Sequence, residues 1–200
     1  MQTKIRFLIA TLAVTPAFSS IGAQHSPTAT RSTTSVPREG NQFDFLVGQW
    51  ELTVIPKVSG LAARIHGAPK LVGTWKAWRA FDGFGIEDEL RIMDGSGNPS
   101  LFAHSMRAFN PEQRRWMISA LDVYRSRMST SSAELKGAEM IVSGQSVDAD
   151  GEPVLVRSRF HGITRDKFQY QQDRSTDNGR TWTEAVLKIE AKRTSATAPR

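Results

Sequence analysis

The segment FGIEDELRIMDGSGNPSLFAHSMRAFNPEQRRWMISALD, residues 84–122, decides the fold class of this 200-residue chain. It contains three short runs of apolar and β-branched residues, which are separated by Asp94-Gly95-Ser96-Gly97 and by Asn110-Pro111. Glycine permits a positive φ and proline fixes φ, so both separating segments favour tight reversals of the chain. The pattern therefore predicts three consecutive antiparallel strands.

The same alternation of strand and turn continues over residues 41–193. About nine antiparallel strands joined by short turns either close into a barrel or pack as a sandwich. Closure leaves no exposed sheet edge, so we expect an all-β fold with a single antiparallel barrel. The expected strands are Trp50–Ile55, Leu71–Phe81, Phe84–Asp94, Leu101–Phe109, Arg115–Asp122, Glu134–Val147, Val154–Gly162, Lys167–Asp173 and Thr183–Lys192.

The N-terminal 23 residues have the pattern of a cleavable secretion signal. Lys4 and Arg6 form a cationic start, residues 7–18 are mostly apolar, and Ala23 is a small residue suited to cleavage. The apolar stretch is shorter than the roughly 20 residues of a membrane span. We expect a periplasmic or secreted protein that is soluble after cleavage near Ala23. Cleavage after Ala17 and an uncut membrane anchor are the alternatives.

Two segments that flank the expected barrel are poor in large apolar residues. Residues 24–40 are rich in Ser, Thr and Pro, and residues 194–200 are similarly small and polar. Such segments cannot bury enough surface to offset the entropy of ordering, so we expect a disordered leader and a disordered tail. The folded domain is then expected over residues 41–193, which is an ordinary size for one domain.

The composition excludes several classes of site. The chain has no cysteine, which excludes disulfides, thiolate catalysis, cysteine-ligated zinc and a lipid on an N-terminal cysteine. It has 26 Lys+Arg against 20 Asp+Glu, a net charge of +6. These basic residues are scattered, whereas nucleic-acid binding needs them clustered on one face. We expect no nucleic-acid partner, and the sequence leaves the oligomeric state open.

Residues 43–50, Phe-Asp-Phe-Leu-Val-Gly-Gln-Trp, resemble the opening of the lipocalin-like proteins, in which a short helix precedes Gly-x-Trp on the first strand. Phe43, Leu46 and Val47 fall at i, i+3 and i+4, so one apolar face of a helical turn can cap an end of the barrel. In that superfamily the tryptophan, here Trp50, closes the barrel base and usually stacks under a basic side chain. The candidates for that basic side chain are Lys188, Lys192 and Arg193.

A closer resemblance is to a family of mostly exported bacterial proteins that has no established activity. Its members share the Phe-Asp-Phe-x-x-Gly-x-Trp opening and a Ser-x-Asp-x-Gly-x-Thr-Trp hairpin, present here at residues 175–182. The hairpin also matches the Asp-box of sialidase propellers, but a propeller needs several four-stranded blades and this chain has one copy. We therefore interpret the hairpin as structural. The expected structural residues are Gly48, Trp50, Ser175, Asp177, Gly179 and Trp182.

Two polar residues interrupt apolar faces of expected strands. Asp88 alternates with Ile86 and Leu90, and His104 alternates with Phe102 and Met106. A buried charge must be paired or hydrogen-bonded, so an Asp88–His104 hydrogen bond that fixes the barrel register is one interpretation. The other is that both residues face an apolar cavity, since small-ligand sites combine apolar walls with a few polar groups.

A barrel of about eight strands has room either for packed side chains or for one small ligand. Trp116, Phe160 and Tyr170 lie on further apolar faces and are the expected walls of such a space. We predict that the barrel binds a small hydrophobic or amphipathic molecule. The predicted ligand-binding residues are Asp88, His104, Trp116, Phe160 and Tyr170.

Two other functions fit the same residues. The first is an envelope hydrolase or isomerase in which His104 acts with Asp88 as a general base, although no Gly-x-Ser-x-Gly nucleophile motif is present. The second is a structural or assembly factor of the envelope whose barrel is filled with side chains. No catalytic residue is assigned, and we expect a binding protein more than an enzyme.

No metal and no cofactor are expected, because zinc needs several clustered ligands that the histidine spacing does not offer. Haem is the alternative cofactor, since a single axial histidine can hold it. His104 and His161 are then the candidate ligands, because His25 lies in the leader and His66 in a loop flanked by Gly and Pro. His161 also alternates with Arg157 and Arg159, on either a polar inner wall or a solvated outer face.

Overall fold

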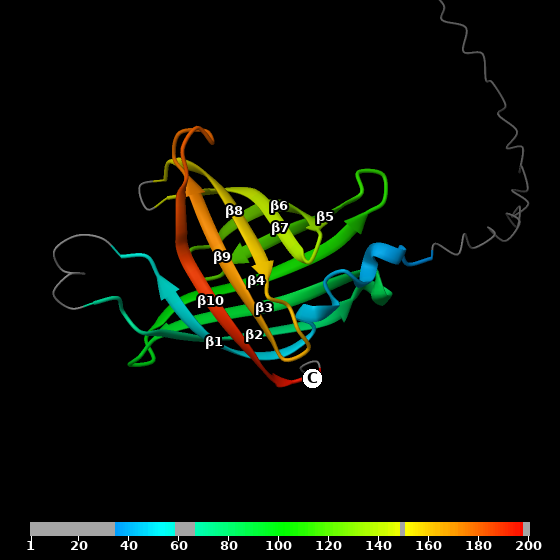
Figure 1. Cartoon of the computed structure of the whole chain (residues 1–200), viewed down its shortest axis with the longest axis horizontal. Helices are drawn as coiled ribbons and strands as arrows, with labels where there is room; N and C mark the ends of the chain where they lie inside the picture. The colour runs from blue at the N-terminus through cyan, green and yellow to red at the C-terminus, as the bar shows by residue number, and fades with distance from the viewer. Residues whose placement is uncertain (1–34, 59–66, 149–150, 198–200) are drawn as a thin grey trace, which may run out of the picture. The chain divides into compact units, whose positions relative to one another are not determined.

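A computed structural model describes residues 35–58, 67–148 and 151–197 (Figure 1). Ten antiparallel strands close into one barrel, and three short 3₁₀ helices accompany them. The expected all-β barrel is confirmed. The strands are β1 (Gly48–Pro56), β2 (Leu71–Ala80), β3 (Gly85–Asp94), β4 (Pro99–Asn110), β5 (Arg115–Asp122), β6 (Arg127–Lys136), β7 (Glu139–Val147), β8 (Pro153–His161), β9 (Lys167–Ser175) and β10 (Thr183–Ser195), and the 3₁₀ helices are η1 (Arg38–Asn41), η2 (Asp44–Leu46) and η3 (Phe81–Gly83).

The barrel is an up-and-down meander, in which each strand pairs with the next one in sequence and β1 pairs with β10 to close the circle. One strand more is present than the sequence predicted. The expected strand over residues 134–147 is β7 together with the last three residues of β6, and the two strands reverse at Gly137 with a φ of 61°. The rest of β6, residues 127–133, was not predicted as a strand. β6 carries Ser129 and Ser131 at inward positions, so it lacks the apolar alternation from which the other strands were predicted.

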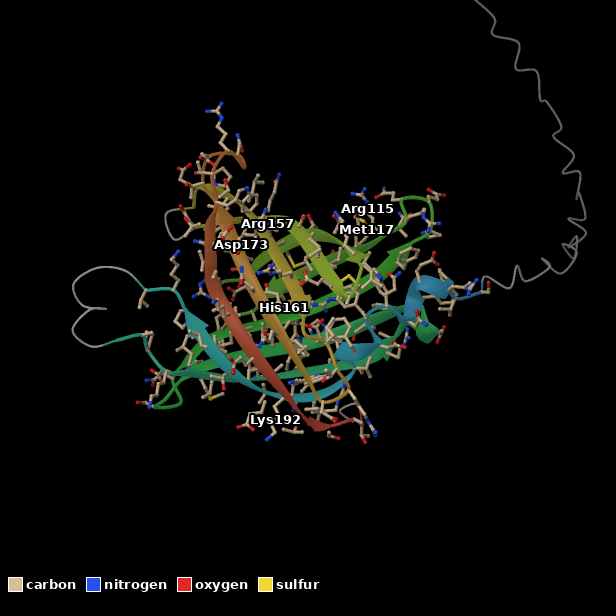
Figure 2. The ribbon with its side chains drawn as sticks, in the orientation of Figure 1. Arg115, Met117, Arg157, His161, Asp173 and Lys192 are labelled. Carbon is tan, nitrogen blue, oxygen red and sulfur yellow. The ribbon has the colours of Figure 1, made fainter. Side chains whose placement is uncertain are left out.

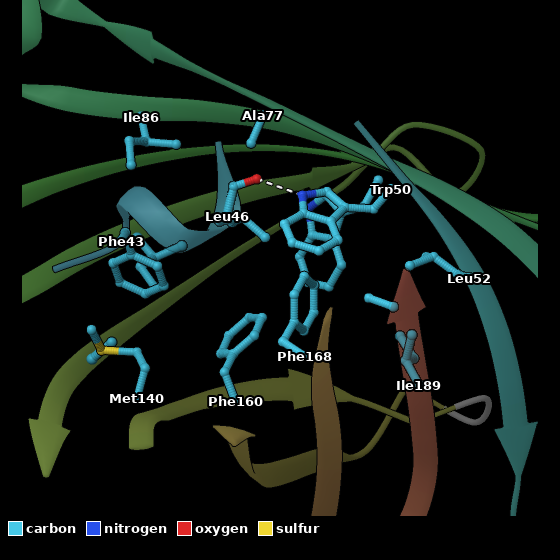
Figure 3. Packing of buried hydrophobic residues seen from close by; sticks show 14 of the residues in the cluster. Phe43, Leu46, Trp50, Leu52, Ala77, Ile86, Met140, Phe160, Phe168 and Ile189 are labelled. Carbon is cyan, nitrogen blue, oxygen red and sulfur yellow. Dashed lines mark hydrogen bonds between the residues drawn. The ribbon is translucent and has the colours of Figure 1, made fainter. Parts of the chain in front are cut away.

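The chain before β1 forms a plug, residues 38–47, at one end of the barrel. Phe43 and Leu46 are fully buried, and the Leu46 carbonyl accepts a hydrogen bond of 2.8 Å from Trp50 Nε1 (Figure 3). The Phe43 ring lies edge-on to Trp116 and Phe160, with centroids 5.0 and 6.1 Å away. The short helix that the sequence predicted is thus a single 3₁₀ turn, η2, and the barrel is solidly packed at this end.

Arg193 of β10 ties the last strand to the plug. Its guanidinium lies 4.0 Å from the centre of the Trp50 ring and donates to the carbonyls of Val47 and Phe45. It therefore occupies the place for which the sequence offered three basic candidates. Gly48 has a φ of 123°, and a side chain there would collide with Arg193 Nη1. The Gly-x-Trp pattern is explained by this close approach.

The folded chain is longer at both ends than the composition suggested. η1 lies inside the expected leader, where Gly40 is buried and its carbonyl accepts a 2.7 Å hydrogen bond from Arg79. At the other end β10 continues to Ser195, and Thr194 Oγ1 donates to the Gln49 carbonyl. These extensions are held by side-chain-to-backbone hydrogen bonds, which cannot be predicted from the apolar content of the sequence.

The secretion signal expected over residues 1–23 and most of the expected leader lie outside the described residues. Within the described ranges, no helix has the length and apolar character needed to cross a membrane.

Candidate functional site: a cavity inside the barrel

The barrel encloses a cavity of about 300 Å³ above the plug. Its apolar walls come from six of the ten strands, and its principal polar groups come from β3, β4, β8 and β9. The principal apolar lining residues are Trp75, Leu90, Leu101, Ile118, Val142, Val156 and Phe160, and the principal polar ones are Asp88, Ser105, Arg107, Ser158, Tyr170, Gln172 and Arg174.

A wider hollow of about 840 Å³, the vestibule, adjoins the cavity. Its walls are the ends of β5 to β8 and of β9, at the end of the barrel away from the plug. The cavity is thus closed on the plug side and leads into the vestibule on the other. The residues that line both spaces are Asp122, Ser129, Thr130, Gln145, Ser146 and Arg174.

A buried ion pair forms the floor of the cavity. Asp88 of β3 is fully buried and pairs with Arg107 of β4, which is 6% exposed. Asp88 Oδ1 also accepts a hydrogen bond of 2.7 Å from Trp75 Nε1. The Arg107 guanidinium lies 5.4 Å from the centre of the Phe43 ring, so the pair sits directly on the plug. Paired charges of this kind are the form in which a barrel interior tolerates ionised groups.

Burial changes the acid–base behaviour of the floor. It lowers the pKa of Arg107 to about 10, because apolar surroundings disfavour the charged form, so the guanidinium is still a cation at neutral pH. Among the described residues, Arg107 Nε has no hydrogen-bond partner. An unpartnered buried donor is costly, and Arg107 is one of the residues that line the cavity.

A second polar group lines the side of the cavity. Tyr170 Oη donates a hydrogen bond of 2.8 Å to Ser158 Oγ and accepts one of 3.2 Å from Gln172 Nε2. Burial raises the pKa of Tyr170, so its hydroxyl stays neutral. The Phe160 ring lies edge-on to it at 5.1 Å. Asp88, Phe160 and Tyr170, three of the predicted ligand-binding residues, line the cavity.

His104 does not face the cavity, which corrects the orientation expected from the sequence. In the β3–β4 register Asp88 lies opposite Ser105, and His104 lies opposite Glu89. Ser105 and Arg107 are the inward residues of β4, so His104 points outward and its ring lies 5.9 Å from that of Trp78. The expected Asp88–His104 pair is not formed, and Arg107 fills the place of its basic partner.

Trp116 is a core residue below the cavity rather than part of its wall. It is fully buried, its Nε1 donates a 3.1 Å hydrogen bond to Gln42 Oε1, and its ring supports Phe43. Arg107 and Arg174 also line the cavity but were not among the predicted site residues. The available signal was the inward series Ala103, Ser105 and Arg107, whose small residues leave space inside a barrel.

Arg157, Arg159 and His161 of β8 lie on its outer face (Figure 2), whereas Ser158 faces the cavity. Arg157 donates to Asp173 Oδ2 over 3.2 and 2.9 Å, and its guanidinium lies 4.5 Å from the centre of the Trp182 ring. The outward position of His161 bears on the haem alternative.

Of the two candidate haem ligands, His104 and His161, neither lies at the cavity. His25 and His66 lie outside the described residues. No group of three or more His, Asp or Glu suited to a metal ion occurs in the described part of the chain.

The hairpin between β9 and β10 is held by its own side chains. Ser175 Oγ donates to Asp177 Oδ1 and accepts from the amide of Gly179, both over 2.8 Å. Asp177 also accepts from the amide and the hydroxyl of Thr181, over 2.9 and 2.6 Å. Trp182 Nε1 donates to the Gly179 carbonyl. Each polar group of the motif thus has a partner inside the turn.

No protein-family model matches the sequence, and no curated protein is significantly similar to it. The chemistry of the cavity is therefore the basis on which a function can be inferred.

Proposed function

We propose that this protein binds one small amphipathic molecule inside its barrel. The observation that carries the proposal is the cavity itself, which is closed by the plug and has apolar walls around a few polar groups. Ligand sites in proteins have this composition and begin at about 300 Å³. A water molecule occupies about 30 Å³ in the liquid, so the cavity corresponds to roughly ten non-hydrogen atoms of ligand.

The polar groups favour an amphipathic ligand over a purely apolar one. Arg107 Nε is a buried donor without a partner among the described residues, and Ser105 is 7% exposed beside it. Buried polar groups in proteins are nearly always hydrogen-bonded. A ligand oxygen above the floor would provide the missing acceptor, whereas a hydrocarbon would leave Arg107 unsatisfied.

The two alternative functions are less well supported. An acid–base pair of His104 and Asp88 would need both groups in one space, but they lie on opposite faces of the β3–β4 pair. Asp88 is in addition engaged by Arg107 and Trp75. A purely structural factor would need no cavity inside its barrel.

The plug, the Trp50–Arg193 contact and the closed barrel support the proposed kinship with lipocalin-like proteins.

Export is part of the proposal and is supported by the sequence of residues 1–23. Mass spectrometry of the protein from its native host tests it, since cleavage near Ala23 gives a mature chain that begins close to Gln24. An uncut chain would contradict export through a cleaved signal.

A cavity-filling variant tests ligand binding. Ala120 lines the cavity, and Ala108 is exposed on the outer face of the neighbouring strand. We expect Ala120→Phe to abolish binding of the neutral fluorophore 1-naphthol, whose size matches the cavity, because the new ring occupies the space. Ala108→Phe adds the same ring outside and should bind like the unsubstituted protein.

Native mass spectrometry of protein from its own host provides the second readout, because it detects a co-purified molecule directly. The proposal is wrong if the host protein carries no ligand and the fluorophore also fails to bind. It is equally wrong if Ala120→Phe, with an intact near-ultraviolet circular dichroism spectrum, binds the fluorophore normally.

A further inference from the structure

Arg174 is a cation that lies where the cavity meets the vestibule. It belongs to the inward series Tyr170, Gln172 and Arg174 of β9, and it lines both spaces. A molecule that enters the cavity from the vestibule must pass this side chain. Its position therefore suits recognition of a group that stays at the cavity mouth.

Arg174 has no acidic partner in the described structure, unlike three other arginines of the barrel and the vestibule. Arg107 pairs with Asp88, Arg125 with Asp122, and Arg157 with Asp173. Arg174 forms none of the ion pairs of the described residues, and its Nε is buried without a hydrogen-bond partner. A partly buried cation with no counter-ion does not serve stability, because burial disfavours its charge. The Arg174 guanidinium is instead suited to bind the anionic group of a ligand that enters from solvent.

The charges around Arg174 favour the same kind of ligand. The vestibule is lined by Arg125, Arg127 and Arg174 against Asp122 and Asp148. Asp122 is already engaged, since its Oδ2 accepts a hydrogen bond of 2.8 Å from Arg125. A hollow with an excess of cations concentrates anions and guides them inward.

We propose that the ligand is an amphipathic monocarboxylate whose acid group is bound by Arg174 and whose apolar body fills the cavity. This inference rests on the proposed function and names the class of ligand for that site. A guanidinium donates two parallel hydrogen bonds to a carboxylate, which gives both affinity and orientation. From Arg174 the apolar walls at Val156, Val142 and Leu90 lead toward the floor. The cavity holds roughly ten non-hydrogen atoms, which corresponds to a medium-length chain.

Three ten-carbon probes that differ only in their head group test this assignment. Calorimetry with the full mature protein compares decanoate, 1-decanol and decylammonium, each below its aggregation concentration. We expect decanoate to bind about tenfold more tightly than 1-decanol, because a charge-assisted hydrogen bond is added. Decylammonium should bind more weakly than both, since it meets Arg174 with a like charge.

Substitution of Arg174 assigns the preference to one side chain. Arg174→Gln is expected to weaken decanoate binding about tenfold and to leave 1-decanol binding unchanged within about twofold. Arg174→Lys should restore part of the decanoate affinity, because it keeps the charge without the forked geometry. Arg159→Gln, which removes an arginine from the outer face of β8, is the matched control and should change neither affinity.

The effect of Arg174→Gln on the ligand-free protein separates binding from folding. Because Arg174 has no acidic partner to lose, the variant should unfold at the same urea concentration as the parent protein or at a higher one. Salt gives an independent measurement on the unsubstituted protein, since raising ionic strength should weaken decanoate and not 1-decanol.

The two proposals fail differently. If decanoate and 1-decanol bind equally well and Arg174→Gln changes neither, the carboxylate assignment is overturned while small-molecule binding stands. If none of the three probes binds and 1-naphthol does not bind either, the proposed function is overturned and the ligand class with it.

Discussion

Asp88 and Arg107 form one residue pair that is both the floor of the cavity and a determinant of the stability of the barrel. Both side chains are buried, and each is the counter-ion of the other. Removing two charges from water is costly, so the stabilising effect of such a pair depends on both members being present. The pair also fixes the β3–β4 register, because a shift by one residue would turn one charge outward.

Replacing one member of this pair is expected to destabilise the protein more than replacing both. Asp88→Leu should lower the free energy of unfolding by about 3–5 kcal/mol, because Arg107 keeps a buried charge with no counter-ion. Arg107→Met should have a loss of similar size, since Asp88 is left with only the Trp75 donor. The double variant should recover much of the loss. Urea unfolding of the four proteins measures this coupling, and simple addition of the two losses would contradict it.

The error at His104 has a physical origin in the lining of the cavity. A prediction from hydropathy assigns Phe102 and Met106 to the inside, because large apolar residues usually pack in a core. In β4 the reverse holds: Met106 is 42% exposed, while Ser105 and Arg107 point inward. A strand that lines a space exchanges large apolar residues for small and polar ones on its inner face. Asp88 was found because β3 keeps the ordinary pattern.

At the scale of elements, the β9–β10 hairpin depends on one carboxylate. Hydrogen bonds from Thr181 lower the pKa of Asp177 from 3.8 to about 2. A carboxyl group with a lowered pKa stabilises the folded state above its unfolded pKa, and this contribution is lost as the pH falls through the folded value. We therefore expect the hairpin to loosen between about pH 4 and pH 2.

Hydrogen exchange of the Thr181 amide, followed by NMR across that range, measures the loosening, because this amide donates to Asp177. Asp177→Asn removes the titrating group and is the control. Its exchange should already be faster at pH 5 and should show no additional loosening below pH 4. A variant that keeps the full pH response would assign the effect to another group.

The plug is the second element whose contribution can be isolated. Phe43 is fully buried against the rings of Trp116 and Phe160, so Phe43→Ala leaves a hole under the cavity floor. The expected loss in the free energy of unfolding is about 3–5 kcal/mol. Phe81→Ala is the matched control, because Phe81 is 47% exposed and its removal should cost less than about 1 kcal/mol. Similar losses in guanidinium unfolding of the two variants would show that the plug does not pack as described.

Elements were predictable where their interior side was apolar and their turns were chemically distinct. The residues of β5 were predicted to the same bounds, and the plug was foreseen from Phe43 and Leu46. β6 was missed because Ser129 and Ser131 face the cavity, so the strand has no apolar rhythm. The small and polar inward residues that leave room for the cavity are thus the reason why its strands cannot be predicted from hydropathy.

At the scale of the whole molecule, the barrel is complete only when the first and last strands meet. β1 and β10 pair over residues 49–56, and Thr53 lies directly opposite Glu190 on the outer surface. No sequence pattern identifies this contact, because it joins the two ends of the domain. It was expected only from the general cost of leaving two sheet edges exposed.

A disulfide across this seam tests the closure, and the absence of native cysteine makes the result unambiguous. Thr53→Cys with Glu190→Cys should oxidise readily and raise the free energy of unfolding by about 4–5 kcal/mol, because the bond closes a loop of more than 100 residues in the unfolded chain. Thr53→Cys with Lys188→Cys is the control, since Lys188 pairs with Ile55 and lies diagonal to position 53. Diagonal Cα atoms are about 7–8 Å apart, which exceeds the reach of an unstrained disulfide. Oxidised and reduced forms of both variants are compared by urea unfolding. Equal stabilisation by both pairs would mean that β1 and β10 do not hold one register.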